Sequence, residues 1–234
     1  QVKVIAFNDI SDEIAENEQE SWSKLIRVLT HEIMNTVTPI ASLSETLSSY
    51  MVDKDADSDV LAGLETISQS SRGLIKFVES YRNLTRVAAP VKKAFYVREM
   101  IDRVIQLTAQ QTSEAGAVCT YLEKSDDILL YADESQISQI LINLIRNACQ
   151  AGANKVEITA ELDRSDSVFI HVTNDGHPIS KESREEIFVP FYTTKQEGTG
   201  IGLSLSRQIM RLHNGTLTLT RSDESGTVFT LYFK

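Results

Sequence analysis

The chain has 234 residues, enough for one large domain or two modest ones. Its hydrophobic fraction of 41% and charged fraction of 24% are typical of a soluble globular protein, and a net charge of −10 without a basic tract argues against nucleic-acid binding. No stretch approaches the roughly 18 consecutive apolar residues of a membrane span, and we expect no signal peptide within these residues. Cys119 and Cys149 show no pairing pattern, which suits a reducing compartment, so we expect a cytoplasmic location.

The N-terminal part predicts a short strand at residues 2–7 and then a long helix, from residue 12 to about residue 51. A lone strand is not stable, so its partners would precede Gln1. We therefore expect a fragment, with any membrane contact confined to a segment upstream. Apolar residues at steps of three or four predict one stripe along the helix: Leu25, Leu29, Ile33, Val37, Ile40, Leu43, Leu47 and Tyr50.

His31 lies about 160° from the middle of that stripe, so it faces solvent. Asn35 shares its face one turn later, and Glu32 lies at the edge of the stripe. The helix lacks the second histidine of a zinc-protease motif. A single histidine on a helix is most often an ordinary surface or core residue. A functional role for His31 therefore needs support from other segments of the chain.

A polar connector at residues 52–59 leads to a second apolar-periodic helix that ends near Ala88. Two long helices with a short connection predict an antiparallel hairpin. One hairpin buries little, because its stripes shield only each other. We therefore expect two copies to pair as a four-helix bundle, which makes the protein a homodimer.

Beyond a linker at residues 88–91, strand and helix patterns alternate. Strands are expected at residues 95–97, 118–122, 128–131, 156–162, 168–173, 216–220 and 227–233, and helices at 98–111, 134–151, 182–188 and 202–213. Asp133 followed by Gln136 reads as a capping box at the start of one helix. The whole chain is then α+β, with a helical hairpin followed by an α/β sandwich that has one sheet face covered by helices.

Four segments of this second part carry polar or glycine patterns. Asn143 and Asn147 lie one turn apart on an apolar helix and suggest a polar ligand or a metal ion, although two surface amides would give the same pattern. Residues 174–179 (Asn-Asp-Gly-His-Pro-Ile) read as a turn, and residues 188–195 as an aromatic flap. The glycines of residues 198–202 precede a helix and can bring backbone N–H groups to phosphates, without matching a Walker or dinucleotide motif.

In this order and spacing, the four segments resemble the ATP-binding boxes of sensor histidine kinases, members of the GHKL superfamily. The His-Glu-Ile-Met-Asn run from His31 to Asn35 resembles the phosphoacceptor box of that family, and residues 4–11 resemble the end of a PAS sensor domain. Residues 146–151 are most similar to the nitrogen-regulation type. The resemblance implies three regions: a PAS end and coiled-coil linker at 1–22, a dimerisation and phosphotransfer hairpin at 23–89, and an ATP-binding catalytic domain at 90–234.

The resemblance also implies residue roles. His31 would be phosphorylated, Glu32 would take its proton, and Asn35 would align a water for dephosphorylation. Asn147 would hold Mg²⁺ against ATP. The other implied nucleotide contacts are Asn143, Arg146, Asn174, Gly176, Lys195, Gly198, Thr199, Gly200 and Gly202. The partner would be the receiver domain of a response regulator, which accepts the phosphoryl group on an aspartate.

Two positions depart from the family pattern. Asn174 stands where the family has an aspartate that reads adenine, and Pro178 stands in place of the second glycine. These departures leave two alternatives to an active kinase: a catalytically weak pseudokinase scaffold, or an ATPase of the same superfamily.

Overall fold

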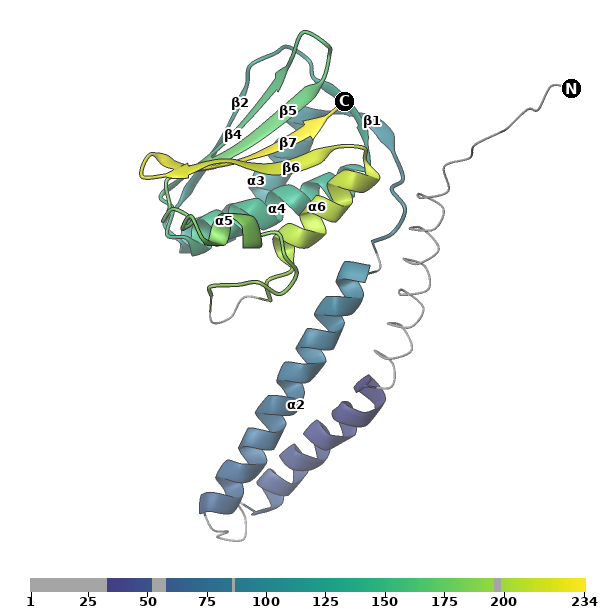
Figure 1. The fold of residues 1–234 in the computed structure, drawn as a ribbon, viewed down its shortest axis with the longest axis vertical. Coiled ribbons are helices and arrows are strands. Elements are labelled where there is room, and N and C mark those ends of the chain that lie inside the picture. Colours follow the sequence, from purple (N-terminus) through teal and green to yellow (C-terminus); the bar gives the residue numbers. More distant parts are fainter. Residues whose placement is uncertain (1–32, 52–57, 86, 196–198) are drawn as a thin grey trace, which may run out of the picture. The chain divides into compact units, whose positions relative to one another are not determined.

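The computed structural model describes residues 33–51, 58–85, 87–195 and 199–234. The chain divides into two compact units, one up to Arg86 and one from Val87 onward, and each is described by itself (Figure 1). The strand expected at residues 2–7, the PAS-like segment, and both His31 and Glu32 lie outside the described residues. Among the described helices, none is both long enough and apolar enough to cross a bilayer.

The first unit contains two helices, residues 33–51 and α2 (Ser58–Thr85), arranged as an antiparallel pair (Figure 1). Polar groups join them. The Ser44 hydroxyl donates to the carbonyl of Leu64 (2.6 Å), and the Glu45 carboxylate accepts from Arg72 Nε (2.9 Å). Ser44, Ser68 and Ser71 are all buried at this contact. Small side chains at this contact leave room for the two backbones to approach closely.

Eight large apolar side chains among the described residues of this unit remain exposed. The exposed set includes four members of the predicted stripe, at 38–60% exposure, and four side chains of α2, at 41–49%: Ile40, Leu43, Leu47, Tyr50, Val60, Ile67, Leu74 and Phe77. In one copy of this unit, these members of the two stripes are not covered by each other. The buried residues among those described in this unit are the three serines together with Val37, Ala41 and Val78, and the exposed apolar side chains lie outside that set.

The second unit alternates strands and helices. In chain order its elements are β1 (Lys93–Tyr96), α3 (Val97–Glu114), β2 (Val118–Glu123), β3 (Leu129–Ala132), α4 (Glu134–Gln150), β4 (Lys155–Leu162), β5 (Val168–Asn174), α5 (Ser183–Glu186), α6 (Gly202–Leu212), β6 (Thr216–Asp223) and β7 (Gly226–Phe233). Every element expected from the sequence in this unit is present, with bounds that differ by a few residues.

The strands form two sheets. β1 pairs with β3, and a five-stranded sheet has the order β2-β4-β5-β7-β6, in which only the β2–β4 pair is parallel. Helices α3, α4 and α6 lie against one face of the larger sheet (Figure 1). This arrangement confirms an α+β fold with a mixed sheet.

The two-residue period of β5 decides which side chains face the helices. Val168, Ile170 and Val172 are buried in the core, and Asn174 continues the same alternation at the end of the strand. A polar side chain is thereby brought to the helix-covered side of the sheet, 5% exposed.

The start of α4 differs from the expected capping box. Asp133 is the N-cap and accepts from the backbone N–H groups of Ser135 and Gln136, as expected. The Gln136 side chain does not return to the N-cap, however, and donates instead to the carbonyl of Ala88 (2.9 Å). The Asp133 N–H donates to Nε2 of the buried His213 (3.0 Å), which supplies the partner that a capping box would have provided.

Candidate functional site

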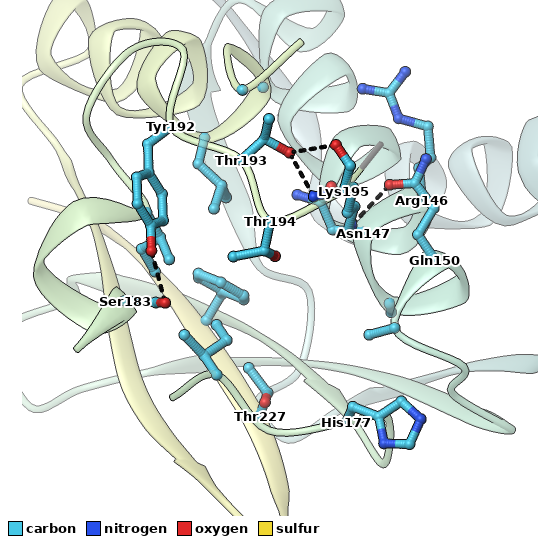
Figure 2. A pocket seen from close by; sticks show the side chains of 18 of the residues that line it. Arg146, Asn147, Gln150, His177, Ser183, Tyr192, Thr193, Thr194, Lys195 and Thr227 are labelled. Atoms are coloured by element: carbon cyan, nitrogen blue, oxygen red, sulfur yellow. Dashed lines mark hydrogen bonds between the residues drawn. The ribbon is translucent and has the colours of Figure 1, made fainter. Parts of the chain in front are cut away.

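A cavity of about 570 Å³ opens on the helix-covered side of the large sheet. Its walls come from the C-terminal half of α4, the turn after β5, α5 with the segment that follows it, the start of α6, and β7. Figure 2 shows Arg146, Asn147 and Gln150 on α4, with Thr227 and His177 at the opposite side of the view. The cavity is large enough for a small-molecule ligand.

The wall formed by α4 presents Asn143, Arg146 and Asn147, which follow helical spacing. Asn143 is buried, and both of its polar atoms have partners: Nδ2 donates to the Ser206 hydroxyl (3.2 Å), and Oδ1 accepts from Arg146 (3.0 Å). Asn143 therefore links α4 to α6 and holds the Arg146 guanidinium. Asn147 lies one turn further along the same face, half-buried.

Gly202 permits this link between the two helices. A Cβ added at Gly202 would lie 2.2 Å from Oδ1 of Asn143, which is far inside contact distance. Because α6 begins at Gly202, the glycine lets the N-terminal end of that helix approach α4 at the cavity. Free backbone N–H groups at a helix N-terminus favour an anion.

Positive charge is concentrated in this part of the cavity. Lys195 donates from Nζ to Oε1 of Gln150 (2.8 Å), which ties the segment before α6 to the end of α4 (Figure 2). Burial and the neighbouring Arg146 cation lower the pKa of Lys195 below its ordinary value of 10.5. Among the described residues that line the cavity there is no aspartate or glutamate, although the chain carries a net charge of −10. The arrangement favours an anionic ligand.

The glycine loop itself has a conformation that requires glycine. Gly200 has a φ of +67°, and a Cβ there would lie 2.4 Å from the carbonyl carbon of Phe191. The Phe191 N–H donates to the Gly200 carbonyl (3.0 Å), so the loop and the segment at 189–191 are held together. Thr199, Gly200 and Gly202 all line the cavity, whereas Gly198 lies outside the described residues.

The opposite end of the cavity is formed by neutral groups of the sheet. Asn174 and Thr227 are cross-strand partners on β5 and β7, and both line the cavity. Asp175 does not line it. Its Oδ1 accepts from the backbone N–H groups of Asn154 and Lys155, at 2.8 Å each, and so joins the turn to β4.

Gly176 does not line the cavity either. A Cβ at Gly176 would meet the carbonyl oxygen of Ala151 at 2.9 Å, and the next residue, His177, donates its N–H to that same carbonyl (2.9 Å). In this structure, therefore, the glycine makes room for the end of α4.

Several lining residues were not identified from the sequence. Tyr192 donates its hydroxyl to Ser183 (2.7 Å) and closes one side, while Gln150, His177 and Thr227 complete the others (Figure 2). Thr227 could have been found, since strand periodicity places it on the inward face, two residues before Phe229. The others lie in segments that the sequence analysis singled out (146–151, 174–179 and 188–195), but which of their side chains face the cavity depends on tertiary contacts. On the first unit, Asn35 lies exposed on the helix over residues 33–51.

Metal-binding potential can be judged from the same residues. The described residues contain no group of three or more His, Cys, Asp or Glu side chains that could enclose a metal ion. Mg²⁺ bound with nucleotide phosphates needs only one or two oxygen ligands from the protein. The Asn147 amide, half-buried on the cavity wall, fits that requirement.

Comparison with known proteins agrees with this geometry. Residues 132–234 match the family of histidine kinase-, DNA gyrase B- and HSP90-like ATPases. The catalytic domain of the histidine kinase ThkA is 36% identical, with a TM-score of 0.55. That match covers 61% of this chain and 94% of the ThkA domain. The chain belongs to the histidine kinases.

Relatives of this histidine kinase chain extend the comparison to the helical unit. The sensor histidine kinase ZraS of Salmonella typhi is 27% identical over 209 residues, which cover 87% of this chain and 44% of ZraS. The chain spans about half the length of the curated relatives it matches. ThkA in complex with the response regulator protein TrrA shares the fold, with a TM-score of 0.65 at 24% identity, covering 98% of this chain and 67% of that one.

Proposed function

We propose that this chain is the transmitter region of a two-component sensor kinase, which transfers the γ-phosphoryl group of ATP to His31 and then to an aspartate of a response-regulator receiver domain. The observation that carries the proposal is the charge distribution of the cavity. Arg146, Lys195 and the start of α6 gather at one end, and neutral groups of β5 and β7 form the other. A polyphosphate joined to an uncharged purine base matches both ends.

The residue roles follow from this placement. Arg146, Lys195 and the backbone around Thr199, Gly200 and Gly202 would contact phosphates, with Gly198 in the same loop. Asn143 would act by holding Arg146 in place. Asn174 would contact the base. Gly176, which packs against Ala151, would act through the shape of the turn.

Asn147 would hold Mg²⁺ together with the nucleotide phosphates. The ion, when bound, neutralises charge on the phosphates as the phosphoryl group is transferred. The remaining contribution of the protein is positioning, because phosphoryl transfer requires little covalent chemistry from side chains. In the transfer step a ring nitrogen of His31 bonds to phosphorus, the bond to ADP breaks, and Glu32 accepts the imidazole proton.

The exposed apolar side chains of the first unit support a homodimer. Eight large apolar side chains are between 38% and 60% exposed there, which is more than an isolated soluble hairpin is expected to leave in water. A second copy that packs against them would complete a four-helix bundle. We propose the region boundaries 1–22, 23–89 and 90–234, with a PAS end first; the division between Arg86 and Val87 supports the second boundary.

A cytoplasmic placement is part of the same proposal. ATP is available there, and the two cysteines, Cys119 and Cys149, are free thiols, as expected in a reducing compartment. We propose that any membrane contact of the whole protein is made by a segment upstream of Gln1.

Incubation with γ-labelled ATP and Mg²⁺ tests the proposal against its two alternatives. An active kinase gives an acid-labile, base-stable label on the protein, and His31→Gln abolishes it while nucleotide binding remains. A pseudokinase scaffold gives no label, and an ATPase releases phosphate without labelling the protein. Label that persists in His31→Gln would assign the acceptor to another residue.

We further propose that two residues of the phosphoacceptor helix serve different reactions, Glu32 in autophosphorylation and Asn35 in dephosphorylation of the regulator. Glu32 adjoins His31 and is suited to act as base, whereas Asn35 is one turn away and exposed. Asn35→Ala should leave autophosphorylation within a few-fold and reduce dephosphorylation of the regulator by about 10- to 100-fold. Glu32→Ala should reduce autophosphorylation most. Equal losses of both reactions in both variants would contradict this division.

A further inference from the structure

The end of the cavity formed by the sheet contains groups that carry no charge. Asn174 and Thr227 present an amide and a hydroxyl, and the Thr227 hydroxyl lies 2.8 Å from that of Ser222. Ser222 in turn accepts from the N–H of Ile179 (2.8 Å). The nearest carboxylate in sequence, Asp175, is directed to the backbone of Asn154 and Lys155 instead. A base bound here would meet no fixed negative charge among the described lining residues.

The orientation of the Asn174 amide is set by its neighbour. The Gly176 N–H lies 3.1 Å from one atom of the amide, and because an N–H can only donate, that atom has to be Oδ1.

The Nδ2 group is then the part of Asn174 that is available to a ligand. Among the described residues no hydrogen bond of Nδ2 accompanies that of Oδ1, and the side chain, although 5% exposed, lines the cavity. An NH₂ group on a cavity wall favours an acceptor on the ligand, because a ligand that covers the group without accepting from it leaves it unpaired, which is costly.

We propose that Asn174 lets this site accept 6-oxopurine as well as 6-aminopurine nucleotides. The inference rests on the proposed nucleotide-binding function and specifies its substrate class. An NH₂ donor can pair with O6 of a 6-oxopurine or with N1 of adenine. A carboxylate in the same place would keep the Gly176 contact with one oxygen and present the other to the base, where it would repel O6 and select the 6-amino group.

Inosine triphosphate is the probe for this inference, because it differs from ATP at position 6 and the adjoining N1 and adds no group at position 2. Calorimetric titration of the wild-type chain in the presence of Mg²⁺ should give dissociation constants for ATP and inosine triphosphate within about 5-fold of each other. The variant Asn174→Asp, measured at mildly alkaline pH, should weaken inosine triphosphate relative to ATP by about 5- to 140-fold, the factor that corresponds to one unpaired buried polar group.

The matched control is Asp175→Asn, which makes the reverse exchange at the next position, outside the cavity lining. It should leave the ratio of the two affinities unchanged. A wild-type protein that binds ATP but binds inosine triphosphate more than about 10-fold weaker would overturn the inference, even if no variant folds. Absence of binding of either nucleotide to the wild type would instead overturn the proposed nucleotide site itself.

Discussion

The two units of the chain differ in whether their large apolar side chains are buried. In the unit from Val87 onward, large side chains from three helices and the sheet are completely buried, among them Met100, Ile137, Ile158 and Met210. In the helical unit, the buried apolar side chains of the described residues are Val37, Ala41 and Val78. One unit contains a core of its own, whereas the other leaves eight large apolar side chains exposed, as a surface for a partner would.

The largest effect is expected where the helical unit lacks a core. Leu43 is 60% exposed on the helix over residues 33–51, and Leu107 is 73% exposed on α3. If Leu43 lies in a dimer interface, Leu43→Asp removes it from both copies and should raise the dimer dissociation constant by at least about 100-fold. Leu107→Asp should leave the dimer intact. Sedimentation equilibrium measures the dimer dissociation constant of both variants. A wild-type protein that is monomeric would show that the exposed side chains of the helical unit are not covered by a second copy.

A second prediction uses glycines from both units. Gly200 has a positive φ and the Phe191 backbone next to it, so alanine there adds about 1–3 kcal/mol of strain and a steric overlap. Nucleotide affinity should fall by roughly 100-fold. Gly73 lies within α2, and a Cβ added there would meet no atom within 4 Å, so Gly73→Ala should raise helix stability by up to about 1 kcal/mol and leave affinity unchanged. Calorimetric titration and thermal unfolding of the two variants distinguish these outcomes.

A third prediction compares Asn174, which lines the cavity, with its neighbour Asp175, which does not. Asn174→Ala removes a buried polar contact to the base and should weaken ATP binding by roughly 1–3 kcal/mol. Asp175→Ala should affect affinity less and lower the melting temperature instead, because the Asp175 carboxylate accepts from the backbone at the start of β4. The reverse ranking of the two affinities would show that Asp175 contacts the base.

The smallest effect concerns pH. Burial and Arg146 hold the pKa of Lys195 below 10.5, so the Lys195 cation is lost at a lower pH than an ordinary lysine loses its charge. Affinity for the nucleotide anion should fall by roughly 2- to 5-fold as pH rises through that pKa. The folding stability of the nucleotide-free protein should instead rise with pH over the same range. A folded-state pKa below that of the unfolded chain means that protonated Lys195 destabilises the folded protein, and this cost is lost when Lys195 is deprotonated. Lys195→Arg keeps its charge and should remove this pH dependence.

The sequence by itself determined the element types and the polar faces. Two-residue periodicity in β5 brings Asn174 to the same side as Val172, and helical spacing aligns Asn143 with Asn147 on α4. Asp133 is the N-cap of α4, as its position before an apolar-periodic run predicts. These features depend on backbone geometry within one element, which is why a local pattern is enough to find them.

Only the tertiary structure decided which partner each polar group meets. Gln136 donates to Ala88 and Asp133 meets His213, which lies 80 residues away in the chain. Asn143 forms hydrogen bonds with Ser206 and Arg146. The Asp175 carboxylate accepts from the backbone at the start of β4, whereas Asn174 lines the cavity. A hydrogen bond is made with the nearest group in space, and local periodicity carries no information on which distant element supplies that group.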